Sequence, residues 1–236
     1  MGSTTTDEDE PRRSVARWIA VGVGMLAFVV ALRAFVLRGF VIRSGSMSPT
    51  VLAGDVIVVD RTAYGGRAPI VNLDVPGFSS PERFDVVVFQ RPGAAEGTIM
   101  AKRLVGLPRD TIMMRDHVLY INGDRIVEPY VRHLESEGRF GPPMSWQVPY
   151  LTSSVTPAKY YPTMDTWGPL VIPPGHYFVM GDRRDASVDS RHWGFVNARH
   201  LKGRAAFVSF SVDSERDGAI PILESVRWER IGTRLY

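Results

Sequence analysis

Hydrophobic residues form one long run near the N-terminus and only short alternating runs after it. The segment from Trp18 to Leu32 holds 15 uncharged residues, and extending the count past Arg33 to residue 37 gives 20. A helix of that length spans about 30 Å, which matches the hydrocarbon core of a bilayer. We therefore predict a transmembrane helix at residues 17–38, after a polar, disordered tail at residues 1–16.

A cleavable signal peptide is the alternative for the same run. The apolar core is preceded by Arg12, Arg13 and Arg17. Signal peptides likewise have a positively charged segment before their apolar region. No small-x-small pair follows promptly in ALRAFVLRGF, which favours an uncleaved anchor. Arginines lie on both sides of the run, so the positive-inside rule does not by itself orient the chain.

The pattern beyond the apolar run is that of strands and turns. Four segments rich in Val, Ile, Phe and Tyr and bounded by Gly, Pro or Asp predict strands at residues 55–60, 84–90, 98–106 and 176–181. Asn122-Gly123 lies between two alternating runs, as in a hairpin with a type I′ turn. No long segment has a 3.6-residue period. We predict a mainly β domain, a barrel or sandwich, at residues 39–236.

Residues 128–168 differ from their surroundings. They are rich in Pro, Gly, Ser, Tyr and Trp and have little strand pattern. We interpret them as an irregular insertion, or a small second lobe, between two parts of one core.

Composition narrows the possible functions. The net charge is +3, and Lys and Arg are spread along the chain without a basic run, so a nucleic-acid partner is not expected. The absence of cysteine excludes disulfides, thiol nucleophiles and Cys-ligated zinc. The chain has five histidines: His117, His133, His176, His192 and His200. They show no metal-ligand spacing, and we expect neither a metal nor a cofactor.

Candidate chemistry lies in four motifs that follow the apolar run. They read SGSMSPT at 44–50, GDVIVVD at 54–60, KRLVGLPRD at 102–110 and GDRRDASVDSRHWGF at 181–195. Taken alone, the first is typical of a turn, and Lys102 is typical of a surface lysine. A serine hydroxyl becomes a nucleophile only when a neighbouring base takes its proton, and lysine can be that base.

The lysine must then lose its proton near neutral pH. With an ordinary pKa of about 10.4, roughly one lysine in a thousand is neutral near pH 7.5. Burial lowers the pKa of an amine, and Lys102 lies in the apolar stretch TIMAKRLVGL. The sequence is therefore compatible with a desolvated, basic lysine.

In this order the motifs resemble those of the type I signal peptidases, the bacterial leader peptidase family of membrane-anchored serine proteases with a Ser/Lys dyad. The resemblance implies a β-fold protease on the outer face of the cytoplasmic membrane, which removes signal peptides from exported preproteins after Ala-x-Ala ends. It implies that Ser46 is the nucleophile and Lys102 the general base. It also implies that Ser44 contributes to the oxyanion hole and that Ser187 hydrogen-bonds and orients the lysine.

The resemblance implies roles for further residues. Four charged residues are expected to hold the site through ion pairs: Asp182, Arg184, Asp189 and Arg191. Six apolar residues match the substrate pocket: Phe40, Ile42, Met47, Val51, Met100 and Ala101. The implied partners are preprotein signal peptides and the lipid bilayer, and we expect a monomer. GDVIVVD is expected to supply a core strand with Asp55 at its turn.

Some residues depart from the family pattern. Arg43 stands where proline is usual, Arg109 replaces the glycine of LPGD, and Arg183 and Ala186 replace asparagines of GDNRDNS. We expect these changes to affect loop geometry and substrate preference. The reaction itself should be unchanged, because the dyad and the oxyanion serine remain. We interpret Arg183 and Asp185 as solvated.

Two other classes of protein fit part of the pattern. A self-cleaving repressor with a Ser/Lys dyad would carry a DNA-binding helical domain, whereas this chain carries an apolar anchor. An inactive membrane-tethered binding module would lack Ser46 or Lys102, and both are present.

Overall fold

The computed structural model describes residues 17–26, 28, 37–67, 74–75, 77–95, 97–132, 144–213 and 225–235. Residues 17–26 and 28 are helical, and their apolar side chains are largely exposed. Among all the residues that the structure describes, no helix has the length and apolar character needed to cross a membrane. Leu37 and Arg38, which we assigned to the anchor, instead begin the first strand of the main sheet.

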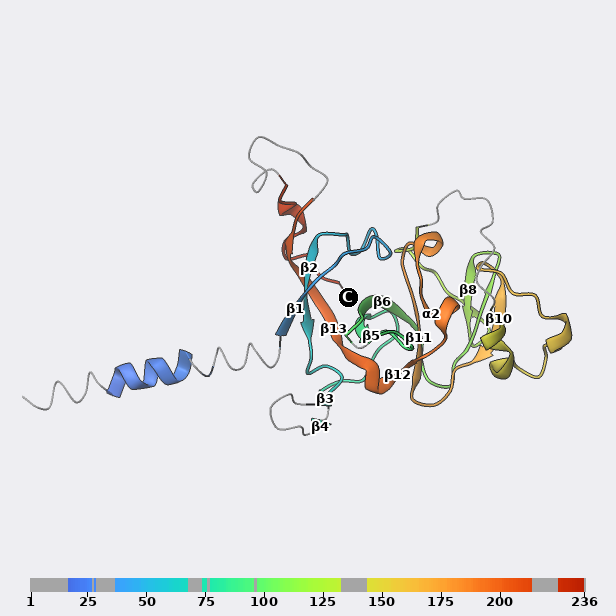
Figure 1. Ribbon diagram of the computed structural model, residues 1–236, viewed down its shortest axis with the longest axis horizontal. Coiled ribbons are helices and arrows are strands. Elements are labelled where there is room, and N and C mark those ends of the chain that lie inside the picture. Colours follow the sequence, from blue (N-terminus) through green and yellow to red (C-terminus); the bar gives the residue numbers. More distant parts are fainter. Residues whose placement is uncertain are drawn as a thin grey trace, which may run out of the picture.

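The main sheet has seven strands in the order β1-β2-β13-β5-β6-β11-β12, and neighbouring strands are antiparallel (Figure 1). The strands are β1 (Leu37–Val41), β2 (Asp55–Asp60), β5 (Val86–Gln90), β6 (Ile99–Gly106), β11 (His176–Met180), β12 (Val196–Asn197) and β13 (Leu201–Ser211). Alternate residues of β2 are buried, since one face of the strand packs on the core. The mainly β class is therefore confirmed.

Strand β13 bends the sheet. It pairs with β5 near its start and with β2 over its later residues, with register shifts along both pairings. Gly203 has φ of 146°, and a Cβ there would lie 2.2 Å from the carbonyl oxygen of Asp60. Only glycine permits this approach, and irregularities of this kind increase strand twist. The sheet consequently curls.

A second sheet of four strands has the order β10-β7-β8-β9. Its strands are β7 (Thr111–Arg115), β8 (Val118–Ile121), β9 (Asp124–Arg125) and β10 (Trp167–Val171). The predicted hairpin is confirmed, because β8 and β9 pair across Asn122 and Gly123, whose φ angles of 55° and 93° suit a type I′ turn. Asn122 also donates a side-chain hydrogen bond to Asp110.

The second lobe is larger than the predicted insertion. It begins with β7, well before residue 128, and closes with β10, which starts at Trp167. Between them lie two 3₁₀ helices, η1 (Ser145–Tyr150) and η2 (Pro157–Lys159). Trp146 and Tyr150 pack on a core built around Trp167 and Phe178. The irregular segment therefore covers a real sheet, which local composition does not reveal.

Short elements complete the described chain. They are strands β3 (Gly66–Arg67) and β4 (Asp74–Val75), helix α2 (Ser190–Trp193), and 3₁₀ helices η3 (Arg184–Ala186), η4 (Ala198–His200) and η5 (Trp228–Arg230). All four strands predicted from composition are present as β2, β5, β6 and β11. Segments with weaker patterns, notably β1, β7, β10 and the long β13, were not predicted.

Candidate active site

Ser46 lies in the turn that follows β1. The amide of Ser48 donates to the carbonyl of Gly45, and the amide of Val51 donates to that of Met47, so the turn closes on itself. The Ser46 carbonyl accepts a hydrogen bond from the amide of Arg183 at 3.2 Å. The motif at 44–50 is thus a turn, as its composition predicts, but one that packs against the motif at 181–195.

Lys102 lies in the middle of β6, opposite Val87 of β5. Its side chain is buried, with 1% of the residue exposed, and Nζ donates a hydrogen bond to Ser46 Oγ. Burial lowers the pKa of Lys102 to about 8, although the negative charge of Asp189 acts in the opposite direction. The structure therefore joins the predicted nucleophile to an amine that is partly neutral near physiological pH.

Ser44 is exposed, and its Oγ lies 3.2 Å from Ser46 Oγ. A hydroxyl at this distance from the attacking oxygen can turn toward a carbonyl oxygen held at Ser46. The structure thus brings Ser44 to the reacting group.

Ser187 is buried, and its Oγ has no hydrogen-bond partner among the described residues. The bond to Lys102 that the resemblance implies is therefore not formed in this structure. Ser187 is nevertheless next to the site: a Cβ at Gly181 would lie 2.2 Å from Ser187 Oγ and 2.5 Å from the Ser46 carbonyl oxygen. Buried hydroxyls are normally hydrogen-bonded. The unpaired Oγ of Ser187 can therefore still form a hydrogen bond with a group that moves toward it.

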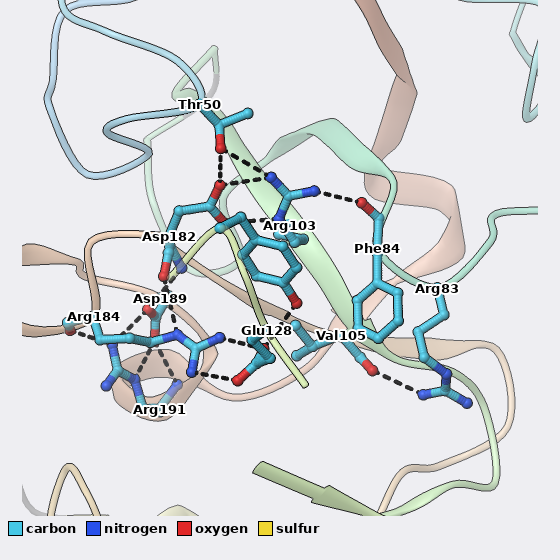
Figure 2. Close-up of polar contacts among 12 residues, drawn as sticks. Thr50, Arg83, Phe84, Arg103, Val105, Glu128, Asp182, Arg184, Asp189 and Arg191 are labelled. Carbon is cyan, nitrogen blue, oxygen red and sulfur yellow. Dashed lines mark hydrogen bonds and ion pairs between the residues drawn. The ribbon is translucent and has the colours of Figure 1, made fainter. Parts of the chain in front are cut away.

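Three buried ion pairs surround the site, as Figure 2 shows for the residues drawn. Arg191 donates to both carboxylate oxygens of Asp189 at 2.9 and 2.8 Å. Burial alone would raise the pKa of Asp189, but the charge and hydrogen bonds of Arg191 outweigh it and lower that pKa to about 2. Asp189 therefore stays ionised near Lys102.

The other two pairs reach outside the motif. Arg184 donates to both oxygens of Glu128, at 2.9 and 2.5 Å, and Arg103 donates to both oxygens of Asp182, at 2.8 and 2.6 Å. Thr50 also donates to Asp182 at 2.5 Å. The ion pairs expected from alternating charges are present, but two of the three partners come from distant segments.

Sequence reasoning missed these partners. Arg103 directly follows Lys102 in the sequence, and it contacts Asp182, the carbonyl of Phe84 and the ring of Tyr130, whose centroid is 3.9 Å from the guanidinium carbon. Glu128 falls at the border of the segment interpreted as an insertion. The available signal for Arg103 was a charged residue inside an otherwise apolar strand, which requires a buried partner.

A groove of about 640 Å³ leads to the dyad. One wall consists of β1 and the residues leading to Ser46, and the other of residues 97–102. Five predicted pocket residues line it: Phe40, Ile42, Met47, Met100 and Ala101. Val51 does not line this groove; it is fully buried in the core that lies against Met47.

Three expectations for other polar residues are revised. Asp55 does more than begin a strand, since Arg230 donates to both its oxygens, at 3.0 and 2.6 Å. Arg183 and Asp185 are half-buried rather than fully solvated.

One histidine does lie in a group of potential ligands. His117 Nδ1 is 3.1 Å from Asp165, and together with Asp185 these residues place one donor atom each within 4.8 Å of one another. The three come from separate segments, so sequence spacing could not reveal them. Such exposed groups commonly occur without an ion, and His133 lies outside the described residues.

Comparisons with known proteins agree with the geometry of the site. A family model described as signal peptidase, peptidase S26, matches residues 15–210. Signal peptidase I of Pseudomonas aeruginosa is 35% identical over 214 residues, which cover 84% of this chain and 73% of that protein. Signal peptidase I of Bacillus caldolyticus is 33% identical over 182 residues, covering 76% of this chain and 82% of that protein.

Among solved structures, a signal peptidase I from Enterococcus faecalis aligns with a TM-score of 0.36 and 34% identity, covering 53% of this chain and 97% of that one. The family match extends over the serine turn, the lysine strand and the ion-paired motif. The chain therefore belongs to the signal peptidase I family of serine endopeptidases, peptidase family S26.

Proposed function

We propose that this protein removes signal peptides from preproteins by a Ser46/Lys102 dyad, cutting after Ala-x-Ala ends at the membrane surface. The observation that carries the proposal is the hydrogen bond between Lys102 Nζ and Ser46 Oγ, with the lysine almost fully buried. A serine beside a desolvated amine has both the nucleophile and the base that acyl transfer needs.

In the first half-reaction, neutral Lys102 takes the proton of Ser46 as Oγ attacks the carbonyl carbon of the scissile bond. The negative charge on the carbonyl oxygen is stabilised by the Ser44 hydroxyl and the Ser46 backbone amide. The ammonium of Lys102 then returns the proton to the leaving amine. The mature protein departs, and the signal peptide remains as an ester on Ser46.

In the second half-reaction, water replaces the leaving amine. Lys102 takes a proton from the water, whose oxygen attacks the ester, and later returns it to Ser46 Oγ. We propose that the protonated amine of Lys102, when it is turned away from Ser46, donates a hydrogen bond to the Ser187 hydroxyl. The unpaired, buried Oγ of Ser187 supports this role.

The substrate is proposed to bind as an added strand. β1 pairs only with β2, and β11 pairs with β6 only from Arg103 onward, so the groove walls present backbone edges that are unpaired among the described strands. An extended peptide can bind such edges through its main chain. Phe40, Ile42 and Ala101 pack on the core beneath, and we propose that the apolar surface they form accepts only small side chains.

We propose that the apolar run beginning at Trp18 anchors the protein in the cytoplasmic membrane, with residues 1–16 inside and a monomeric catalytic body outside. β1 begins at Leu37, only a few residues after the run, and Arg38 already lines the groove. The reaction would then take place close to the bilayer, where the apolar segment of a signal peptide delivers the bond.

The test uses full-length protein in detergent with a precursor peptide ending in Ala-x-Ala before the cut. Ser46→Ala and Lys102→Ala should each abolish cleavage while the protein stays folded, whereas Lys159→Ala, at an exposed lysine of η2, should retain wild-type turnover. Retention of a tenth of wild-type turnover by Lys102→Ala would reject the dyad.

Two further experiments address specificity and topology. A peptide with Leu or Phe immediately before the cut should not be cleaved, and efficient cleavage would reject the small-residue pocket. Protease added to intact spheroplasts should degrade the catalytic body, and protection of that body would reject the proposed orientation.

A further inference from the structure

The groove beside the dyad is positively charged. Its charged lining residues are Arg38, Arg43 and Lys102, and none of the described residues that line it is acidic. The guanidinium of Arg38 lies over the Phe40 ring, 5.4 Å from its centroid, so this cation already has a partner. The other arginine of the lining, Arg43, lies closer in sequence to the reacting Ser46.

Arg43 is exposed and forms no ion pair or side-chain hydrogen bond with another described residue. It follows Ile42, which packs on the core, and precedes Ser44, whose hydroxyl reaches Ser46. Ile42 is partly buried against the core whereas Arg43 is exposed, so the Arg43 side chain is directed to solvent. Its charge is available to a bound peptide.

A second arginine lies on the other side of the serine turn. The amide of Arg183 donates to the Ser46 carbonyl at 3.2 Å, and the Arg183 Nη1 atom would be 3.7 Å from a Cβ placed on Gly45. The Arg183 guanidinium has no ion pair or hydrogen bond with a described residue. Arg183 does not line the groove. Because its backbone amide contacts the Ser46 carbonyl, a peptide that passes Ser46 as it leaves the groove would approach Arg183.

We propose that Arg43 and Arg183 are specificity-determining residues that favour substrates with acidic side chains beside the scissile bond and disfavour those with Lys or Arg there. This inference rests on the proposed function. When the two alanines of Ala-x-Ala point into the apolar pocket, the intervening x side chain points outward, to the face that Arg43 occupies. Residues after the cut meet Arg183.

The expected effect is moderate because both arginines are reached by solvent. Exposed charge pairs are weak and are screened by salt. Replacing Lys by Glu at one position exchanges repulsion for attraction, so kcat/KM should rise on the order of threefold to tenfold in about 50 mM salt. The ratio should fall toward one in about 500 mM salt.

The experiment compares matched peptides in a neutral detergent. One series carries Glu, Gln or Lys at x, and a second carries them at the second residue after the cut. Arg43→Gln should reduce the Glu-to-Lys ratio of the first series, and Arg183→Gln that of the second. Arg115→Gln, which removes the same charge from an exposed position on β7 in the second sheet, should change neither ratio.

The outcomes separate this inference from the proposed function. Equal kcat/KM for Glu and Lys peptides in wild type would overturn it, as would a ratio that persists in high salt or changes equally in Arg115→Gln. Cleavage of the Gln peptides establishes that the enzyme is active in the same assay. If no peptide is cleaved by wild type, the proposed function fails, and the inference fails with it.

Discussion

Arg103 donates two hydrogen bonds to the two carboxylate oxygens of Asp182, at 2.8 and 2.6 Å, and thereby ties the strand that carries Lys102 to the motif at 181–195. Both side chains are buried, with 8% and 0% exposed. Figure 2 shows Arg103 between Asp182 and the carbonyl of Phe84. The position of Lys102 therefore depends on a residue outside the proposed dyad.

Removal of one partner of this pair should destabilise the protein strongly. Arg103→Met leaves the buried carboxylate of Asp182 with Thr50 as its remaining side-chain partner, and breaking a buried pair costs about 3–5 kcal/mol. Denaturant unfolding in detergent measures this loss. The double variant Arg103→Met with Asp182→Leu should lose less than Arg103→Met alone. A loss below about 1 kcal/mol in the single variant would contradict the assignment.

The pH dependence of cleavage should report the buried lysine. Because only the neutral amine accepts the serine proton, kcat/KM should rise with pH and reach half its maximum near pH 8, where burial places the pKa of Lys102. About a quarter of the lysine is then neutral near pH 7.5, against about a thousandth for an ordinary lysine. Lys102→Arg, which stays charged, should be inactive at every pH. A midpoint above pH 10 would contradict this role.

Burial of the amine should also cost stability. Its pKa is about 8 in the folded protein and 10.5 in an unburied lysine, so the penalty is fully present below pH 8 and disappears as pH rises through 10.5. Lys102→Met should therefore be more stable than wild type by about 2 kcal/mol at pH 7, after allowance for the lost hydrogen bond. The difference should shrink at higher pH. Unfolding by denaturant at pH 7 and pH 10 tests this, and a less stable Lys102→Met at pH 7 would refute it.

Ser44 should act on the transition state. If its hydroxyl donates to the oxyanion, Ser44→Ala should lower kcat about 10²- to 10³-fold with little change in KM. Ser44→Thr keeps the hydroxyl and should retain far more activity. A turn residue without this role would instead give near-normal kcat in Ser44→Ala, with at most a small fall in Tm. Steady-state kinetics of both variants distinguishes the two.

Local patterns in the sequence determined the class of the fold, and the order of four motifs identified the residues of the proposed dyad. The strands β2, β5, β6 and β11 have short β-branched runs bounded by turn residues, and the Asn122-Gly123 turn requires two positive φ angles that few other pairs accept. Ser46 and Lys102 were predicted as nucleophile and base because four motifs occur in the order of the signal peptidase family, whereas either motif alone favours a turn or a surface lysine. These properties depend on neighbours along the chain.

Only the tertiary structure decided which distant residues meet. Lys102 and Ser46 are 56 positions apart, and Arg103 and Asp182 are 79 apart, so no local pattern predicts either contact. The bend of β13 and the size of the second lobe arise from sheet pairing and packing, which override weak strand propensity. The pKa of Lys102 likewise depends on burial and on Asp189, which are properties of the folded site and not of the motif.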